Sequence, residues 1–154
     1  MHHPAWQPKG RSAVSPYLAV RDAHLVLDFA KAVFDAEEIT QPLWFEDGRL
    51  WNAEISIGDS SLMLAEAPAG DGTAMPAAVY VYVEDPDAVF ARAIGAGAEE
   101  VMPVEDQFYG DRAGGVRDLA GNVWWIATHR ETLNHPDLVA RAREVEHRRA
   151  QEKE

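Results

Sequence analysis

The chain contains no cysteine, which excludes disulfide bonds, thiolate metal sites and a cysteine nucleophile. It also lacks any apolar run near the roughly 20 residues that a membrane-spanning helix needs. The first nine residues, MHHPAWQPK, contain neither the apolar stretch nor the cleavage site of a secretory signal. These absences predict a cytoplasmic protein with no membrane partner. Its 154 residues are enough for one domain, or for two small modules that share a core.

Basic residues are scarce. The chain has 14 lysines and arginines against 26 aspartates and glutamates, which gives a formal net charge of −12. Residues 1–140 carry 9 of the basic and 22 of the acidic side chains. A body this acidic repels a phosphate backbone, so we expect no nucleic-acid partner. The acidic surface either attracts cationic ligands or simply keeps the protein soluble.

The sequence contains an internal repeat. PYLAVRDA at 16–23 corresponds to VYVYVEDP at 79–86, and AEEI at 36–39 corresponds to AEEV at 98–101, with offsets of 63 and 62. Each copy begins with an alternating strand and an aspartate able to cap the helix that follows. We predict helices over 23–34 and 86–94. Turn residues then divide each copy into three further strands, over 38–45, 50–57 and 60–66 and over 99–105, 112–118 and 122–129.

The pattern predicts an α+β fold in which two tandem β-α-β-β-β modules form a curled mixed sheet around a cup. We divide the chain into a flexible N-terminal arm (1–12), a first module (13–66), a linker (67–76), a second module (77–130) and a C-terminal helix (131–154). The helix carries an apolar stripe that is predicted to pack on the body or on a partner subunit: Leu138, Val139, Ala142 and Val145.

Three segments carry a family resemblance. They are SPYLAVRDA at 15–23, AEISIGDSSLMLAE at 53–66 and YGDRAGGVRDLAGNVWWIATH at 109–129. In this order they resemble the vicinal oxygen chelate superfamily, which includes glyoxalase I, bleomycin-resistance proteins and extradiol dioxygenases, and in particular its PhnB-like, glyoxalase-related branch. The resemblance covers about residues 14–130. It implies that each copy curls its sheet into half of a cup and that paired copies or subunits enclose a ligand.

The resemblance also indicates where a metal would be bound. Metal enzymes of the family place histidine and glutamate ligands on the first and last strands of each copy. In this chain those positions fall at Ser15, Met63, Ala78 and Trp125, and none of them offers the imidazole or carboxylate that such a site needs. We therefore predict that the protein uses no metal and no other cofactor.

Strand alternation predicts which side chains line the cup. If the positions that correspond to the family's metal ligands face inward, Met63 and Trp125 are among the inward side chains. Tyr17, Tyr80 and Tyr82 then face the same way. Their neighbours would pack on the helices: Leu18, Val20, Leu62, Leu64, Val79, Val81, Trp124 and Ile126. An aromatic lining is typical of a site for a planar or hydrophobic ligand. The alternative is that these rings fill a collapsed core.

Glu54 is the carboxylate that this geometry turns inward. A two-residue turn at Gly58-Asp59 pairs Glu54 with Met63. There Glu54 would serve as a general base or as a hydrogen-bond anchor for a ligand. Alternatively, it is an edge carboxylate that reaches water or an arginine such as Arg112 or Arg117.

Arg112 lies in the loop expected at the rim of the cup. It would meet an anionic ligand there, although pairing with Asp111 or Asp118 is the simpler expectation. His129 closes the last strand, and its ring is expected to cap the sheet.

Two classes of function remain. The first is a metal-independent protein that sequesters or carries a hydrophobic or planar small molecule in an aromatic-lined cup. The second is a metal-independent enzyme that uses Glu54 for proton transfer, isomerisation or cyclisation. A third, simpler outcome is a cup that is closed. In every case we expect a homodimer, because a second copy would cover the open side of each curled sheet.

Overall fold

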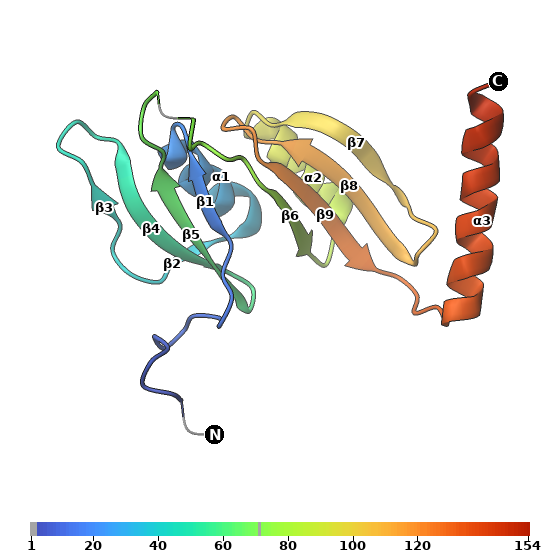
Figure 1. Cartoon of the computed structure of the whole chain (residues 1–154), viewed down its shortest axis with the longest axis horizontal. Coiled ribbons are helices and arrows are strands. Elements are labelled where there is room, and N and C mark those ends of the chain that lie inside the picture. The colour runs from blue at the N-terminus through green and yellow to red at the C-terminus, as the bar shows by residue number, and fades with distance from the viewer. Residues whose placement is uncertain (1–2, 71) are drawn as a thin grey trace.

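The computed structural model describes residues 3–70 and 72–154 and contains two β-α-β-β-β units followed by a helix (Figure 1). The first unit comprises β1 (Tyr17–Val20), α1 (Ala23–Phe34), β2 (Glu37–Glu38), β3 (Leu43–Trp44), β4 (Leu50–Ile57) and β5 (Ser60–Glu66). The second comprises β6 (Ala78–Tyr82), α2 (Pro86–Gly95), β7 (Glu99–Asp106), β8 (Asp111–Arg117) and β9 (Val123–His129), and α3 (His135–Glu152) ends the chain. The predicted strand over 38–45 is instead two short pieces, because Pro42 between them has no N–H to donate to a ladder.

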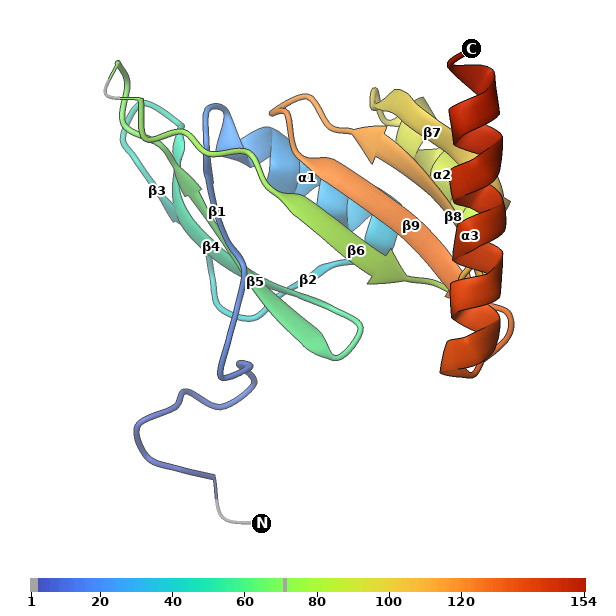
Figure 2. The same cartoon turned by 45° about the vertical axis from the view of Figure 1, so that its right-hand side comes forward.

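Each unit forms its own sheet. The first sheet has the order β1-β5-β4-β2, with β3 also paired to β4, and the second has the order β6-β9-β8-β7. In both, the first and last strands of the unit run parallel, so that Tyr17 pairs with Met63 and Tyr80 with Trp125. α1 and α2 pack against each other on one side of the sheets, as Figures 1 and 2 show. The predicted α+β fold with curled sheets and a C-terminal helix is confirmed.

The two corresponding helices begin differently. Asp85 caps α2, since its Oδ1 accepts a hydrogen bond from the backbone N–H of Ala88 at 3.1 Å. Asp22 does not cap α1: it has φ 59° and makes no side-chain cap bond. Glu66 at the end of β5 accepts from the N–H groups of Asp22 (3.1 Å) and Ala23 (2.9 Å) instead. The prediction of an Asp22 cap is therefore wrong, because a carboxylate distant in sequence satisfies these donors.

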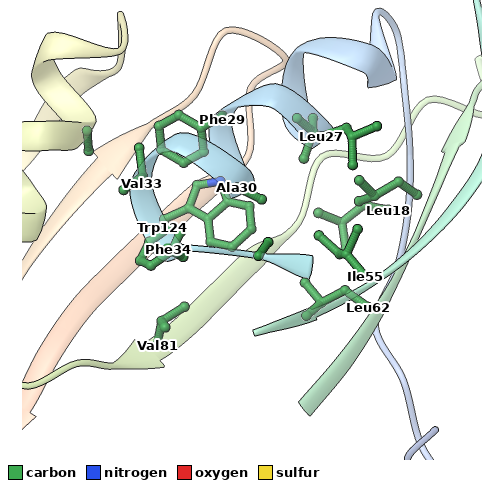
Figure 3. Packing of buried hydrophobic residues seen from close by; sticks show 14 of the residues in the cluster. Leu18, Leu27, Phe29, Ala30, Val33, Phe34, Ile55, Leu62, Val81 and Trp124 are labelled. Carbon is green, nitrogen blue, oxygen red and sulfur yellow. The ribbon is translucent and has the colours of Figure 1, made fainter. Parts of the chain in front are cut away.

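The core lies between the helices and the sheets and joins the two units. The predicted helix-facing set is buried except for Val79, which is half-buried; the buried members are Leu18, Val20, Leu62, Leu64, Val81, Trp124 and Ile126. At its centre the fully buried Trp124 of β9 stacks on Phe34 of α1, with ring centroids 5.1 Å apart, and also lies 5.6 Å from Phe29 (Figure 3). The last strand of the second unit thus completes the core of the first.

The two ends of the chain lie outside these layers (Figure 1). Asn134 caps α3 by accepting from the N–H of Asp137 at 2.9 Å, but none of the residues of α3 is buried. The predicted flexible arm is tied to the first sheet at its inner end, since Ser12 N–H donates to Ser61 Oγ at 3.1 Å. None of the helices that the structure describes is long and apolar enough to cross a membrane.

Candidate functional site

The faces of the two sheets opposite α1 and α2 carry most of the predicted site residues, divided into two groups. Tyr17, Glu54 and Met63 lie on the first sheet, and Tyr80, Tyr82 and Trp125 lie on the second. The tyrosines are largely open to solvent, with exposed fractions of 57% for Tyr17, 42% for Tyr80 and 62% for Tyr82. The rings therefore do not fill a closed core in this chain.

The indole of Trp125 occupies space left open by a glycine on the neighbouring strand. Gly115 of β8 is its direct cross-strand partner. A Cβ added at Gly115 would lie 2.5 Å from Cζ3 and 2.7 Å from Cε3 of the indole, so the ring lies directly over the glycine. Any larger residue at position 115 would displace it. The indole therefore leans over β8, while Tyr80 in β6, the partner of Trp125 on the other side of β9, carries a second ring on the same face of the sheet.

Beside these rings lies a polar cluster that the sequence analysis missed. The carboxylate of Asp111, only 4% exposed, accepts hydrogen bonds from the hydroxyls of Tyr80 (2.8 Å) and Tyr82 (2.9 Å) through Oδ2. Its Oδ1 lies 2.8 Å from Nδ1 of His129, whose Nε2 lies 2.7 Å from Oγ1 of Thr132.

The electrostatics of this cluster keep the carboxylate ionised and the phenols protonated. Burial works to raise the pKa of Asp111, but the hydrogen bonds from His129, Tyr80 and Tyr82 outweigh it and hold the pKa below its ordinary value. Burial and the hydrogen bonds to Tyr109 and Asp111 raise the pKa of Tyr80 far above its usual range. The hydrogen bond to Asp111, assisted by burial, also raises the pKa of Tyr82.

The signal for this cluster was present in the sequence. Pairing of strands 112–118 and 122–129 in the observed register sets Asp111 opposite His129. Alternation then places both side chains on the face that carries Tyr80 and Tyr82. The expected strand began one residue too late, which left Asp111 in the preceding loop.

Glu54 occupies its predicted register but has an unexpected partner. It pairs with Met63 across β4 and β5, as the turn at Gly58-Asp59 requires. Its carboxylate forms an ion pair with Arg11 of the N-terminal segment, rather than with Arg112 or Arg117. Both side chains are partly exposed, at 22% for Glu54 and 20% for Arg11.

Arg112 does not lie with the other predicted site residues. Its cross-strand partner is Thr128, so it faces the helix side of the sheet, opposite to its neighbour Asp111. It forms a bidentate pair with Asp87 of α2, with both distances 2.9 Å, and a further contact with Asp106 at 3.3 Å. The expected pairing with Asp111 or Asp118 is therefore wrong. Asp111 is the adjacent strand residue and points to the opposite face, and the carboxylate of Asp118 accepts hydrogen bonds from Asn122 and Trp124 instead.

A hollow of about 310 Å³ lies where the two units meet. Residues 12, 14 and 16 of the N-terminal segment form one wall, the turn around Gly58 another, and β6 the third. Tyr80 and Tyr82 line it together with apolar groups that include Val14, Ile57, Leu62, Val79 and Val81. The hollow lies along the edge of β6 and adjoins Tyr80 and Tyr82.

The positions of a family metal site do not suit a metal here. Ser15 Oγ is engaged with Ser61 Oγ at 2.9 Å, and Met63, Ala78 and Trp125 offer no carboxylate or imidazole. Over residues 3–70 and 72–154, the structure gathers no three histidine, aspartate or glutamate side chains in a metal-binding arrangement.

Comparison with known proteins agrees with this architecture. An uncharacterized protein of Mycobacterium bovis is 34% identical over 139 residues, which cover 83% of this chain and 90% of that protein. The crystal structure of TioX from Micromonospora sp. ML1 is 26% identical, covers 80% of this chain and all of that one, and has a TM-score of 0.61. A putative 3-demethylubiquinone-9 3-methyltransferase, a PhnB protein from Bacillus cereus, shares the fold at 18% identity with a TM-score of 0.58 over 76% of this chain and 99% of its own. The model of the Glyoxalase/Bleomycin resistance protein/Dioxygenase superfamily matches residues 11–126, and the chain belongs to that superfamily.

Proposed function

We propose that this protein binds a planar, largely apolar small molecule on the open face of its second sheet, without a metal ion. The observation that carries the proposal is the aromatic surface formed by Trp125 over Gly115 and the adjacent, solvent-exposed Tyr80 and Tyr82. Aromatic groups open to water on a concave face are typical of ligand sites. The hollow of about 310 Å³ beside them is at the small end of the usual range for such sites, roughly 300–1,000 Å³.

The state of Glu54 favours binding over catalysis. A general base must be directed at the proton of its substrate, whereas Oε2 of Glu54 is engaged by Nε of Arg11. A carboxylate neutralised by an arginine acts as a structural tie between the N-terminal segment and the sheet. Proton transfer by Glu54 is therefore the less supported of the two functions, and the superfamily itself hosts both enzymes and binding proteins.

A homodimer and a cytoplasmic location belong to the same proposal. The exposed aromatic side chains of both sheets form apolar surface that a monomer does not usually leave open. A second copy would cover these faces and enclose the ligand between units. Sedimentation should then give a mass of twice the 17.0 kDa of the chain, and a monomer at micromolar concentration would contradict this part.

The binding proposal is tested with the neutral fluorescent probe N-phenyl-1-naphthylamine. Stacking on an indole contributes roughly 0.5–1.5 kcal/mol, so Trp125→Ala should weaken binding of the probe by about 2- to 12-fold. Trp51→Ala is the control, because Trp51 is exposed and stacks on Phe45 away from this face. Native mass spectrometry of the freshly purified protein would report any ligand already bound. The proposal fails if the probe does not bind, or if Trp125→Ala leaves its affinity unchanged.

A further inference from the structure

All of the side-chain hydrogen bonds to Asp111 are donated to its carboxylate by neighbouring groups. Its carboxylate, held ionised, can only accept, so Tyr80 and Tyr82 must each donate their single hydroxyl proton to it. The hydroxyl of Tyr109 lies 3.0 Å from that of Tyr80. Because the proton of Tyr80 is already engaged, Tyr109 is the donor in this contact. The imidazole of His129 likewise donates its Nδ1–H to the carboxylate.

This arrangement leaves only acceptors for a ligand. The phenol oxygens of Tyr82 and Tyr109 keep free lone pairs, and these two side chains are 62% and 37% exposed. The carboxylate itself is too deeply buried for direct contact, but its charge polarises the phenols that donate to it. A carboxylate of a ligand, which can only accept, would therefore find no donor in this cluster.

The charge of the cluster comes from the carboxylate of Asp111, whose ion-pair partner is the imidazole of His129. Within the described residues, Asp111 is paired with no lysine or arginine, since its sequence neighbour Arg112 points to the opposite face and binds Asp87. The rings of Tyr80 and Tyr82 lie 5.3 Å apart at 62° and present electron-rich surface, to which cations are attracted. The net charge of −12 adds a long-range attraction of the same sign.

We propose that the Tyr80–Tyr82–Asp111 cluster is an acceptor-only subsite, which selects a planar ligand carrying a cationic N–H group. The inference rests on the proposed function and specifies the chemical class of its ligand. The flat part of the ligand stacks on Trp125, and its charged N–H group binds the phenol oxygens. The buried carboxylate fixes the direction of the phenol protons and supplies the charge.

The test uses two probes of the same three-ring size and opposite charge, 9-aminoacridine as the cation and 9-anthracenecarboxylate as the anion. Binding is followed by fluorescence titration of the full-length protein. The wild type should bind the cation at least about tenfold more tightly. Tyr82→Phe should weaken 9-aminoacridine by about 2- to 12-fold, the scale of one hydrogen bond, and leave the anion unchanged. Trp51→Phe is the control, because Trp51 stacks on Phe45 away from this face, and it should change neither affinity.

The possible outcomes distinguish failure of this subsite from failure of the proposed binding function. Equal affinity for the two probes, or an equal effect of Tyr82→Phe on both, would overturn the acceptor-only subsite while leaving the binding function intact. If neither probe binds the wild type, both the subsite and the binding function are wrong. Should Tyr82→Phe fail to fold by circular dichroism, Tyr109→Phe replaces it, because it removes the other free phenol oxygen and carries the same expected selectivity.

Discussion

The close approach of Gly115 and Trp125 gives a prediction whose size follows from the structure. In Gly115→Ala the added methyl group would lie 2.5 Å from Cζ3 and 2.7 Å from Cε3 of the indole, well inside van der Waals contact. The rigid ring must shift as a whole, since the contact is with its body and not with a flexible end. Such overpacking costs about 1–3 kcal/mol of unfolding free energy. Urea denaturation of the variant should show this loss.

The same substitution should behave oppositely once the indole is absent. In a Trp125→Ala background the methyl group meets no ring, and an alanine replaces a glycine within a strand, which favours folding by about 0.5–1 kcal/mol. Gly114→Ala is the control, because its Cβ would lie 2.8 Å from Val104 Cγ2 and 2.9 Å from the Val104 backbone nitrogen. It should destabilise both backgrounds equally. If Gly115→Ala is equally damaging with and without Trp125, the indole does not lie over the glycine and the reasoning is refuted.

Three further predictions concern buried or capping carboxylates. Asp118→Ala removes the acceptor of the Trp124 indole N–H, 2.8 Å away, and should lower the unfolding free energy by at least about 3 kcal/mol in urea; a loss below about 1 kcal/mol would contradict this. The folded-state pKa of Asp111 lies below its ordinary value of 3.8, so its stabilisation is present above that pH and is lost as the pH falls through the lower folded value. The difference in stability between wild type and Asp111→Asn should therefore shrink in acid below about pH 4, and a difference that does not vary with pH would exclude this linkage. Glu66→Ala should cost about 1 kcal/mol as the loss of a helix cap, whereas Asp22→Asn should leave thermal stability unchanged; the reverse order would show that Asp22 is the cap.

The sequence was sufficient to predict the architecture because the repeat and the strand alternation are local patterns. The offset of 62–63 residues located both units, and alternation separated the buried Leu18 and Trp124 from the open Tyr17 and Trp125. The turn at Gly58-Asp59 correctly predicted the pairing of Glu54 with Met63. Each of these inferences depends on residues close together in the chain or on one pairing register.

The remaining features depend on contacts between distant segments. Glu66 caps a helix 43 residues earlier in the chain, and Arg11 reaches Glu54 at the same separation, so no local pattern could identify either partner. The error at Arg112 had a different origin. The strand begins at Asp111, so Asp111 and Arg112 both lie within it and point to opposite faces, whereas the sequence-based prediction placed them together in a loop.

The stacking of Trp124 on Phe34 has a consequence for how the chain folds. An internal repeat suggests two halves able to form separately, yet each half would lack part of the core: the first would expose Phe34 and Phe29, and the second would expose an indole. We therefore expect the halves to unfold in a single cooperative transition. A chain broken within residues 67–76 should give fragments that are unstructured alone and regain their fold only when mixed, as a noncovalent complex. We therefore expect the two units to behave as one folding domain in which neither copy is autonomous.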